Sequence, residues 1–304
     1  MKMEALVFGN VTLDVICYPV NDVPRHESIS FDNATVSPGG CGSNTAIGLA
    51  AMDVPTGILG WVGDGDAADL IFRYWERFGL DTRFVARDPQ KPTATSIGLV
   101  DSDFQPRFVH TPGANSNVTS EIIDPPNIAA TGAKFFHVAG FFVLENLFDG
   151  FGEKLAALKA LGMTTSLDVA FNVRMEDPKL RAALWDAMPH LDYFMANENE
   201  AYRLTGEKDP EKAAMVLRAQ GAQNVIIKLG AQGCYALSDG FTGVVPAIEV
   251  EVVDTTGAGD AFASGLIEAL SRGANLEAAL ESGNQAGGKM CSKLGAIAAW
   301  VEGM

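Results

Sequence analysis

The 304-residue sequence lacks several features that mark special classes of protein. It has only 22 lysines and arginines against 38 acidic residues, a net charge of −16, and its basic residues form no cluster. This balance argues against nucleic acid as a partner. The four cysteines show no C-x-x-C spacing, so neither a zinc motif nor a redox motif is indicated. Reduced thiols in a cytoplasmic protein are the simplest interpretation.

Long apolar segments are also absent. No apolar run approaches the roughly 20 residues that cross a bilayer, and the start, MKMEALVFGN, lacks the apolar core and cleavage site of a signal peptide. We therefore expect no membrane contact. What is present is an ordinary globular composition, 47% hydrophobic, which can form one large domain or a main domain with an appendage.

Strand-like runs alternate with helical patterns along most of the chain. Residues 5–9 and 56–63 are apolar and strand-like, whereas residues 43–52, 260–272 and 276–293 show helical periodicity. Further strands are expected in KFFHVAGFF, TTSLDVA, LDYFMAN and NVIIKLG. The alternation predicts a doubly wound α/β fold, with a mostly parallel sheet and helices on both faces.

Two segments break this rhythm. Residues 15–37 and 93–113 contain strand-like runs around polar turns, with no helix between them. They are typical of β-hairpins inserted into an α/β body. We expect them to form a small β-sheet lid, and the exposed edges of such a sheet could pair across a homodimer.

The segment DTTGAGDAF (254–262) combines a tight turn with an acidic residue at the start of a helical pattern. Gly257, Ala258 and Gly259 would bring several backbone N–H groups onto one point, which suits a phosphate. Asp260 is itself an anion, so it either caps the helix or shares the site with a phosphate for a chemical reason. In phosphoryl transfer the base and the anion hole must lie close to one reacting group.

With this segment and PGGCGSNTA (38–46), the chain resembles the ribokinase-like family of carbohydrate kinases, the phosphofructokinase B type, over nearly its whole length. The resemblance implies one α/β kinase domain over residues 1–304, with the β lid placed over a sugar. It also implies ATP and Mg²⁺ as cofactors, Asp260 as the general base and residues 257–260 as the anion hole.

The resemblance assigns five residues to the sugar. Asp14 matches the carboxylate that binds sugar hydroxyls, with a turn or lid cap as the alternative; a carboxylate can accept two such donors. Gly39 and Gly40 match the pair that lets the sugar approach the backbone. Asn44 matches a polar contact to the sugar or caps a helix. Asn115 either binds sugar or makes an Asx turn.

The nucleotide is assigned to the later part of the chain. Asn197 and Glu200 have the spacing of a helix capping box, and the resemblance also implies that they lie near the phosphates, with Glu200 holding Mg²⁺ through water. The other residues implied beside the nucleotide are Lys228, Gly230, Gly233 and Asn284. Those implied near a monovalent cation such as K⁺ are Asp254, Thr256 and Gly295. The segment SLDVAFNVR, with Asp168 and Arg174, resembles a phosphate-side segment of the family.

The sequence therefore predicts an ATP-dependent phosphotransferase that acts on a primary hydroxyl of a small sugar or sugar acid. The acceptor is expected to be unphosphorylated, because the inferred lid and pocket offer only Arg25 and Arg107, and Cys41 stands where ribokinases often have lysine. One alternative is a nucleoside kinase, left open by Phe104 and Phe108 in the lid. A second is a sugar-binding protein without catalysis.

Overall fold

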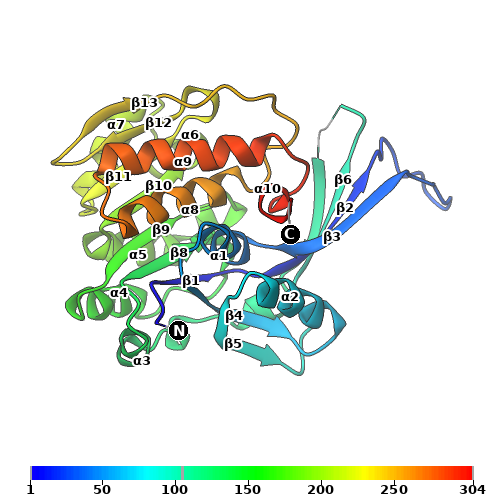
Figure 1. Ribbon diagram of the computed structural model, residues 1–304, viewed down its shortest axis with the longest axis horizontal. Helices are drawn as coiled ribbons and strands as arrows, with labels where there is room; N and C mark the ends of the chain where they lie inside the picture. Colours follow the sequence, from blue (N-terminus) through cyan, green and yellow to red (C-terminus); the bar gives the residue numbers. More distant parts are fainter. Residues whose placement is uncertain (1, 104–105, 303–304) are drawn as a thin grey trace.

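A computed structural model describes residues 2–103 and 106–302, so Phe104 lies outside the described residues. The chain forms a nine-stranded sheet covered by helices and a separate four-stranded sheet that projects from one end of the body (Figure 1). The large sheet contains β1 (Ala5–Gly9), β4 (Thr56–Gly63), β5 (Asp81–Asp88), β8 (Phe135–Ala139), β9 (Thr164–Asp168), β10 (Tyr193–Asn197), β11 (Asn224–Lys228), β12 (Cys234–Leu237) and β13 (Thr242–Val245).

The small sheet and the helices complete the fold. The small sheet contains β2 (Thr12–Tyr18), β3 (Asn33–Gly39), β6 (Thr95–Val100) and β7 (Pro106–Thr111). The α-helices are α1 (Cys41–Ala51), α2 (Asp66–Arg77), α3 (Pro125–Ala130), α4 (Phe151–Ala160), α5 (Pro178–Ala187), α6 (Glu198–Thr205), α7 (Pro210–Ala219), α8 (Ala258–Ser271), α9 (Leu276–Cys291) and α10 (Ala298–Val301). The doubly wound fold with a small second sheet is thus confirmed.

The large sheet runs in the order β13-β12-β11-β10-β9-β8-β1-β4-β5. All neighbouring pairs are parallel except β11–β12 and β12–β13. The chain goes from β1 outward to β4 and β5 and later returns to β8 on the other side of β1. In open α/β sheets such a reversal leaves a crevice at the carboxyl ends of the strands, where ligands bind.

Successive side chains of the strands point to opposite faces, and each face is covered by its own helices. Leu6 and Phe8 of β1 join the apolar cluster formed with α4, α5, α6 and α7. Ala5 and Val7 join the cluster formed with α1, α2, α8 and α9. The long parallel core therefore fixes the carboxyl ends of the strands from both sides.

The small sheet has the order β3-β2-β6-β7 and two distinct faces. Asp14 lies opposite Ser37 and Ser96, so these residues share one face. Val15 lies opposite Val36 and Ile97 on the other face. The strands extend beyond the segment predicted at 15–37, because β2 begins at Thr12 and β3 ends at Gly39. Asp14 is consequently a residue of the small sheet and not of the first strand's end.

Several elements differ from the sequence-based expectation. The predicted strand KFFHVAGFF is shorter, because Gly140 adopts a left-handed conformation with φ 74° and ends β8. Helix α1 begins at Cys41, two residues before the predicted start. Among the described residues, no helix combines the length and apolar character needed to cross a membrane.

Candidate active site

The predicted site residues gather at the carboxyl edge of the large sheet, beside the start of α8. Asn10 and Gly140 follow β1 and β8, and Lys228 ends β11. The lid sheet projects from the same end of the body, near α1 and α10 (Figure 1). The site therefore lies at the reversal point of the sheet, where its topology predicts a ligand crevice.

The two glycines at the start of α8 have different roles. Gly257 is the N-cap residue with φ 78°, and a Cβ there would clash with the backbone of Ala296. Gly259 lies inside the helix, and its φ is outside the left-handed region. The expectation that both glycines make the turn is therefore wrong for Gly259. A Cβ at Gly259 would instead lie 3.1 Å from Lys228 Nζ, so this glycine leaves room for the ammonium.

Asp260 lies in the first turn of α8, and no side chain caps this helix. Its Oδ2 accepts a 2.8 Å hydrogen bond from Asn44 Nδ2 of α1. The Cys41 thiol, at the start of α1, also acts on the carboxylate and favours its charged form. Burial raises the pKa of Asp260 to about 7, although the bond from Asn44 opposes this rise. A carboxylate with this pKa is suited to accept a proton near neutral pH.

Asn44 and Cys41 both lie near Asp260, at the start of α1. Asn44 donates to Asp260, while its Oδ1 is buried and has no partner in the described part of the chain. Asn44 therefore does not cap α1, whose N-cap is Gly40 with no side-chain cap bond. Burial, followed by the charges of Asp260 and Asp168, raises the pKa of the Cys41 thiol well above its usual range. Cys41 is thus a neutral thiol.

The small sheet carries Asp14 on β2, beside Gly39, which ends β3 just before α1. Thr12 Oγ1 donates to Asp14 Oδ1 at 2.6 Å, and burial raises the pKa of Asp14 to about 6. A Cβ at Gly39 would clash with this carboxylate, so Gly39 makes room for Asp14 itself. Gly40 adopts φ 83° with Asn10 O beside it, where a side chain would be strained and crowded.

A buried charged cluster lies next to the start of α8. Lys228 Nζ donates to Asp168 Oδ2 at 2.5 Å, and their side chains are 15% and 9% exposed. Glu200 is also buried, and burial raises its pKa although Lys228 opposes the shift. Asn197 and Glu200 form the predicted capping box, since Oδ1 of Asn197 accepts from Glu200 N and Oε2 of Glu200 accepts from Asn197 N. The cluster joins β9, β11 and α6.

Asn284 and Gly233, two of the residues predicted beside the nucleotide, pack against the end of β13. Asn284 of α9 donates from Nδ2 to the carbonyls of Val245 and Pro246 at 3.0 and 3.1 Å. A Cβ at Gly233 would clash with Val245 O, so this turn also packs on β13. A Cβ at Gly230 would meet no atom within 4 Å. The turn after β11 is thus open on its Gly230 side.

Asp254, in the loop before α8, accepts hydrogen bonds from two backbone N–H groups and one side chain near it. Its Oδ1 accepts from Thr256 N and Oγ1 at 2.9 and 2.7 Å, and its Oδ2 accepts from Gly295 N at 2.9 Å. Asp254 is therefore in direct contact with both Thr256 and Gly295, the other two residues predicted near a monovalent cation.

Asn115 has a structural role that the sequence did not reveal. It lies in the 3₁₀ segment Gly113–Asn117, where its Oδ1 accepts from Val11 N and its Nδ2 donates to Val11 O. Among the described hydrogen bonds, its side chain makes no Asx turn, so that alternative is wrong. The paired bonds tie the return of the lid to the residue that precedes β2.

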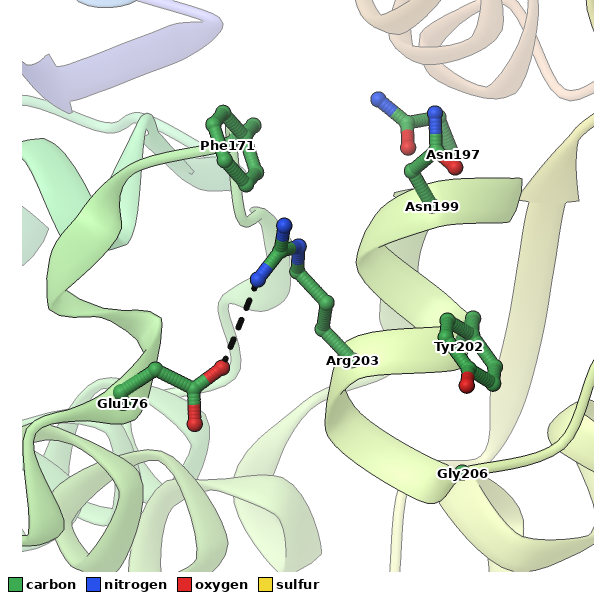
Figure 2. Close-up of a pocket in the computed structure, with 7 residues that line it drawn as sticks. All are labelled: Phe171, Glu176, Asn197, Asn199, Tyr202, Arg203 and Gly206. Carbon is green, nitrogen blue, oxygen red and sulfur yellow. Dashed lines mark ion pairs between the residues drawn. The ribbon is translucent and has the colours of Figure 1, made fainter.

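The rim of the site holds a cavity of about 770 Å³ between α6 and the segment after β9. Figure 2 shows Arg203 extending from α6 toward this segment, with Phe171 and Glu176 on either side of its guanidinium. Asn197 and Asn199 line the other side of the cavity. The cavity therefore opens beside Asn197 at the carboxyl end of β10. Arg174, predicted on the phosphate side, is ion-paired with Glu145.

Comparison with known proteins shows what the whole chain is similar to. The family model described as pfkB family carbohydrate kinase matches residues 2–302. An aminoimidazole riboside kinase of Salmonella typhimurium is 28% identical over 86% of this chain and 84% of its own length. A 2-dehydro-3-deoxygluconokinase of Bacillus subtilis is 27% identical over 94% of this chain and 89% of its own. A structure from E. coli assigned to ribokinase II, with ATP and Mg²⁺, has a TM-score of 0.86, 24% identity and coverage of 98% and 95%.

Proposed function

Because the chain belongs to the pfkB family of carbohydrate kinases, we propose that it transfers the γ-phosphoryl group of ATP to a primary hydroxyl of a small, unphosphorylated sugar or sugar acid. The observation that supports this most strongly is the position of Asp260. Its half-buried carboxylate lies in the first turn of α8, is oriented by Asn44 and has a pKa raised by burial to about 7.

In this proposal the acceptor hydroxyl lies between Asp14 and Asp260. The hydroxyl oxygen attacks the γ-phosphorus while Asp260 takes its proton. The bond from the γ-phosphorus to the bridging oxygen breaks, and its electron pair leaves with ADP. At the start of α8 the N–H groups of Gly257, Gly259 and Asp260 stabilise the charge on the phosphoryl oxygens. The N–H of Ala258, in contrast, already donates to Thr255 O.

The nucleotide is proposed to lie along Asn197, Glu200 and the turn after β11, with its adenine near Asn284. Mg²⁺ is commonly held by one or two carboxylates together with substrate phosphates, and the buried Glu200 can supply a carboxylate through water. The proposal of K⁺ near Asp254, Thr256 and Gly295 rests on the resemblance. Adding K⁺ or Na⁺ at constant ionic strength tests it.

The preference for an unphosphorylated acceptor is supported by the lid. Arg107 donates to the carbonyls of Val20 and Asn21 and lies opposite Leu99, on the face of the lid away from Asp14. It therefore does not point toward the proposed acceptor. Arg25 is exposed in the loop between β2 and β3.

One observation favours the second candidate, a nucleoside kinase. Ile16 and Phe108 lie on the Asp14 face of the lid, where their side chains meet over Gly98. Together with Val253 and Leu294 of the body they line a small cavity. This apolar wall could contact a flat base attached to the sugar.

ADP release in the presence of Mg²⁺ and ATP, measured without acceptor and with a panel of sugars, sugar acids, sugar phosphates and nucleosides, tests the proposal. We expect release only with an acceptor, and faster with a neutral or singly charged sugar than with fructose 6-phosphate. A sugar phosphate as the best acceptor would contradict the proposed specificity. Sugar binding without ADP release for any acceptor would indicate a protein without catalysis.

We also propose a cytoplasmic location, where ATP is abundant, and a homodimer formed through the lid. Val36, Ile97 and Val109 lie on the lid face away from Asp14 and are 42%, 38% and 61% exposed. A second lid could cover this apolar row. Light scattering of wild type and of Val109→Lys would show a dimer that the charge disrupts.

A further inference from the structure

The sequence predicts Lys228 beside the nucleotide, next to the turn after β11. That role does not explain why its ammonium group lies in a cluster of carboxylates. Its Nζ is buried at the end of β11 and donates to Asp168, and within the described residues this is its only hydrogen bond. An ammonium has three donors, so two remain for another partner. The carboxylates of Glu200 and Asp260 also act on this charge.

The ammonium lies against the first turn of α8. A Cβ at Gly259 would be 3.1 Å from Nζ, and nothing in the backbone conformation of Gly259 requires glycine. A glycine inside a helix is less stable than an alanine, so the space beside Lys228 has been kept at a cost in stability. A cation at a helix N-terminus is also unfavourable, because both are positive. An anion bound between them would remove this conflict.

Asp168 and its neighbours keep the ammonium charged. Burial alone would lower the pKa of Lys228, but Asp168, Glu200 and Asp260 together raise it above its usual range. Asp168 Oδ2 takes one donor, and Asp168 Oδ1 is buried without a partner in the described part of the chain. Asp168 therefore holds the Lys228 ammonium by one hydrogen bond, close to the residues that start α8.

We propose that the Lys228 ammonium contacts the phosphoryl group in transfer, opposite the N–H groups of α8, and that Asp168 is the positioning residue that holds it there. This inference rests on the proposed kinase activity. The transferred group carries charge on three oxygens. Lys228 neutralises this charge from one side while the start of α8 does so from the other.

The test compares binding of ATP with binding of ADP, since only ATP carries the group that Lys228 contacts. Calorimetry with Mg²⁺ is done on wild type, Lys228→Met and the control Lys159→Met. Lys159 has a similar partly buried pair with Asp192, which precedes β10 at the opposite edge of the sheet. We expect Lys228→Met to lose about tenfold in affinity for ATP with ADP affinity unchanged, and to lose about 10²–10³ in kcat. The control should match wild type.

Two further variants keep the test decisive. Asp168→Asn should lower kcat less than Lys228→Met, and the double variant should be no slower than Lys228→Met, because Asp168 acts through Lys228. If Lys228→Met does not fold, Gly259→Ala crowds the ammonium without removing it and should also reduce the preference for ATP over ADP.

An unchanged ratio of ATP to ADP affinity in the folded variant would overturn the inference. A wild-type protein that binds no ATP and releases no ADP with any acceptor would instead overturn the proposed function.

Discussion

The edge of the large sheet and the lid each supply one carboxylate to the proposed site, but they hold it in different ways. Asp260 is held by Asn44, 216 residues away in the sequence, and lies beside the buried pair of Lys228 and Asp168. Asp14 is held by Thr12, only two residues away on the same strand. The first arrangement exists only when the whole body is folded, whereas the second belongs to a single strand of the lid.

The two regions also differ in how much apolar surface they bury. The large sheet is covered by helices on both faces, whereas the lid leaves one apolar row largely exposed. Segments with few buried contacts open at low free-energy cost, and reacting groups need rigid support. This comparison suggests that the body carries the phosphoryl chemistry and that the lid selects the acceptor.

The largest expected effect comes from removing Asp260, the proposed general base, which belongs to the α/β body. Asp260→Asn should lower kcat by about 10²–10⁴-fold, the usual cost of losing a general base. The amide is nearly isosteric and can still accept the bond from Asn44. ATP affinity by calorimetry and the melting temperature should therefore stay close to those of wild type.

Asp66→Asn is the matched control for this change, because Asp66 is an acidic residue in the first turn of another helix, α2. It should leave kcat unchanged. Wild-type turnover in Asp260→Asn would show that Asp260 is not the base. It would also contradict the conclusion that the body carries the phosphoryl chemistry.

A smaller effect is expected in the lid. Asp14→Asn should raise KM for the acceptor by about 10- to 100-fold, because a hydrogen bond to a charged group contributes about 1.5–3 kcal/mol. KM for ATP should change little. Asp22→Asn, in the exposed loop after β2, serves as the control. An equal rise in KM for ATP would mean that the lid is not specific to the acceptor.

The smallest effect separates the two acceptor classes. If the acceptor carries a base, Phe108→Ala should raise its KM by about tenfold, since stacking of a base on an aromatic ring contributes about 1–3 kcal/mol. For a free sugar the change should be slight. Val109→Ala on the opposite face of β7 is the control. A loss confined to free sugars would contradict the proposed position of Phe108.

Much of this architecture follows from local sequence patterns. Alternation of apolar runs predicts the α/β fold, and the segment around Asp260 predicts a helix start with an acidic residue. The sequence does not predict β5, β12 and β13. Strand β5 is largely polar, and β12 and β13 have only four residues each, so all three give a weak periodic signal.

Contacts between distant segments could not be read from the sequence. Gly257 and Gly259 look alike in the sequence, yet one makes a turn and the other makes room for Lys228. The Asp168–Lys228 pair joins residues 60 apart. Its only local signal is that both residues end parallel strands, whose carboxyl ends share one edge. Asn115 was expected in a turn or at the sugar, but its partner is Val11 on another segment.

The pH dependence of kcat/KM for the acceptor, measured at saturating ATP and Mg²⁺, tests the role of Asp260 most directly because it needs no substitution. Burial raises the pKa of Asp260 to about 7 and that of Asp14 to about 6. Protonation prevents Asp260 from taking the hydroxyl proton and weakens Asp14 as an acceptor for hydroxyl donors. We expect kcat/KM to fall about tenfold per pH unit below 7 and more steeply below 6. In Asp14→Asn the steeper limb should disappear while the limb near 7 remains. A wild-type profile that stays flat from pH 8 to pH 5 would contradict the carboxylate of Asp260 as the base.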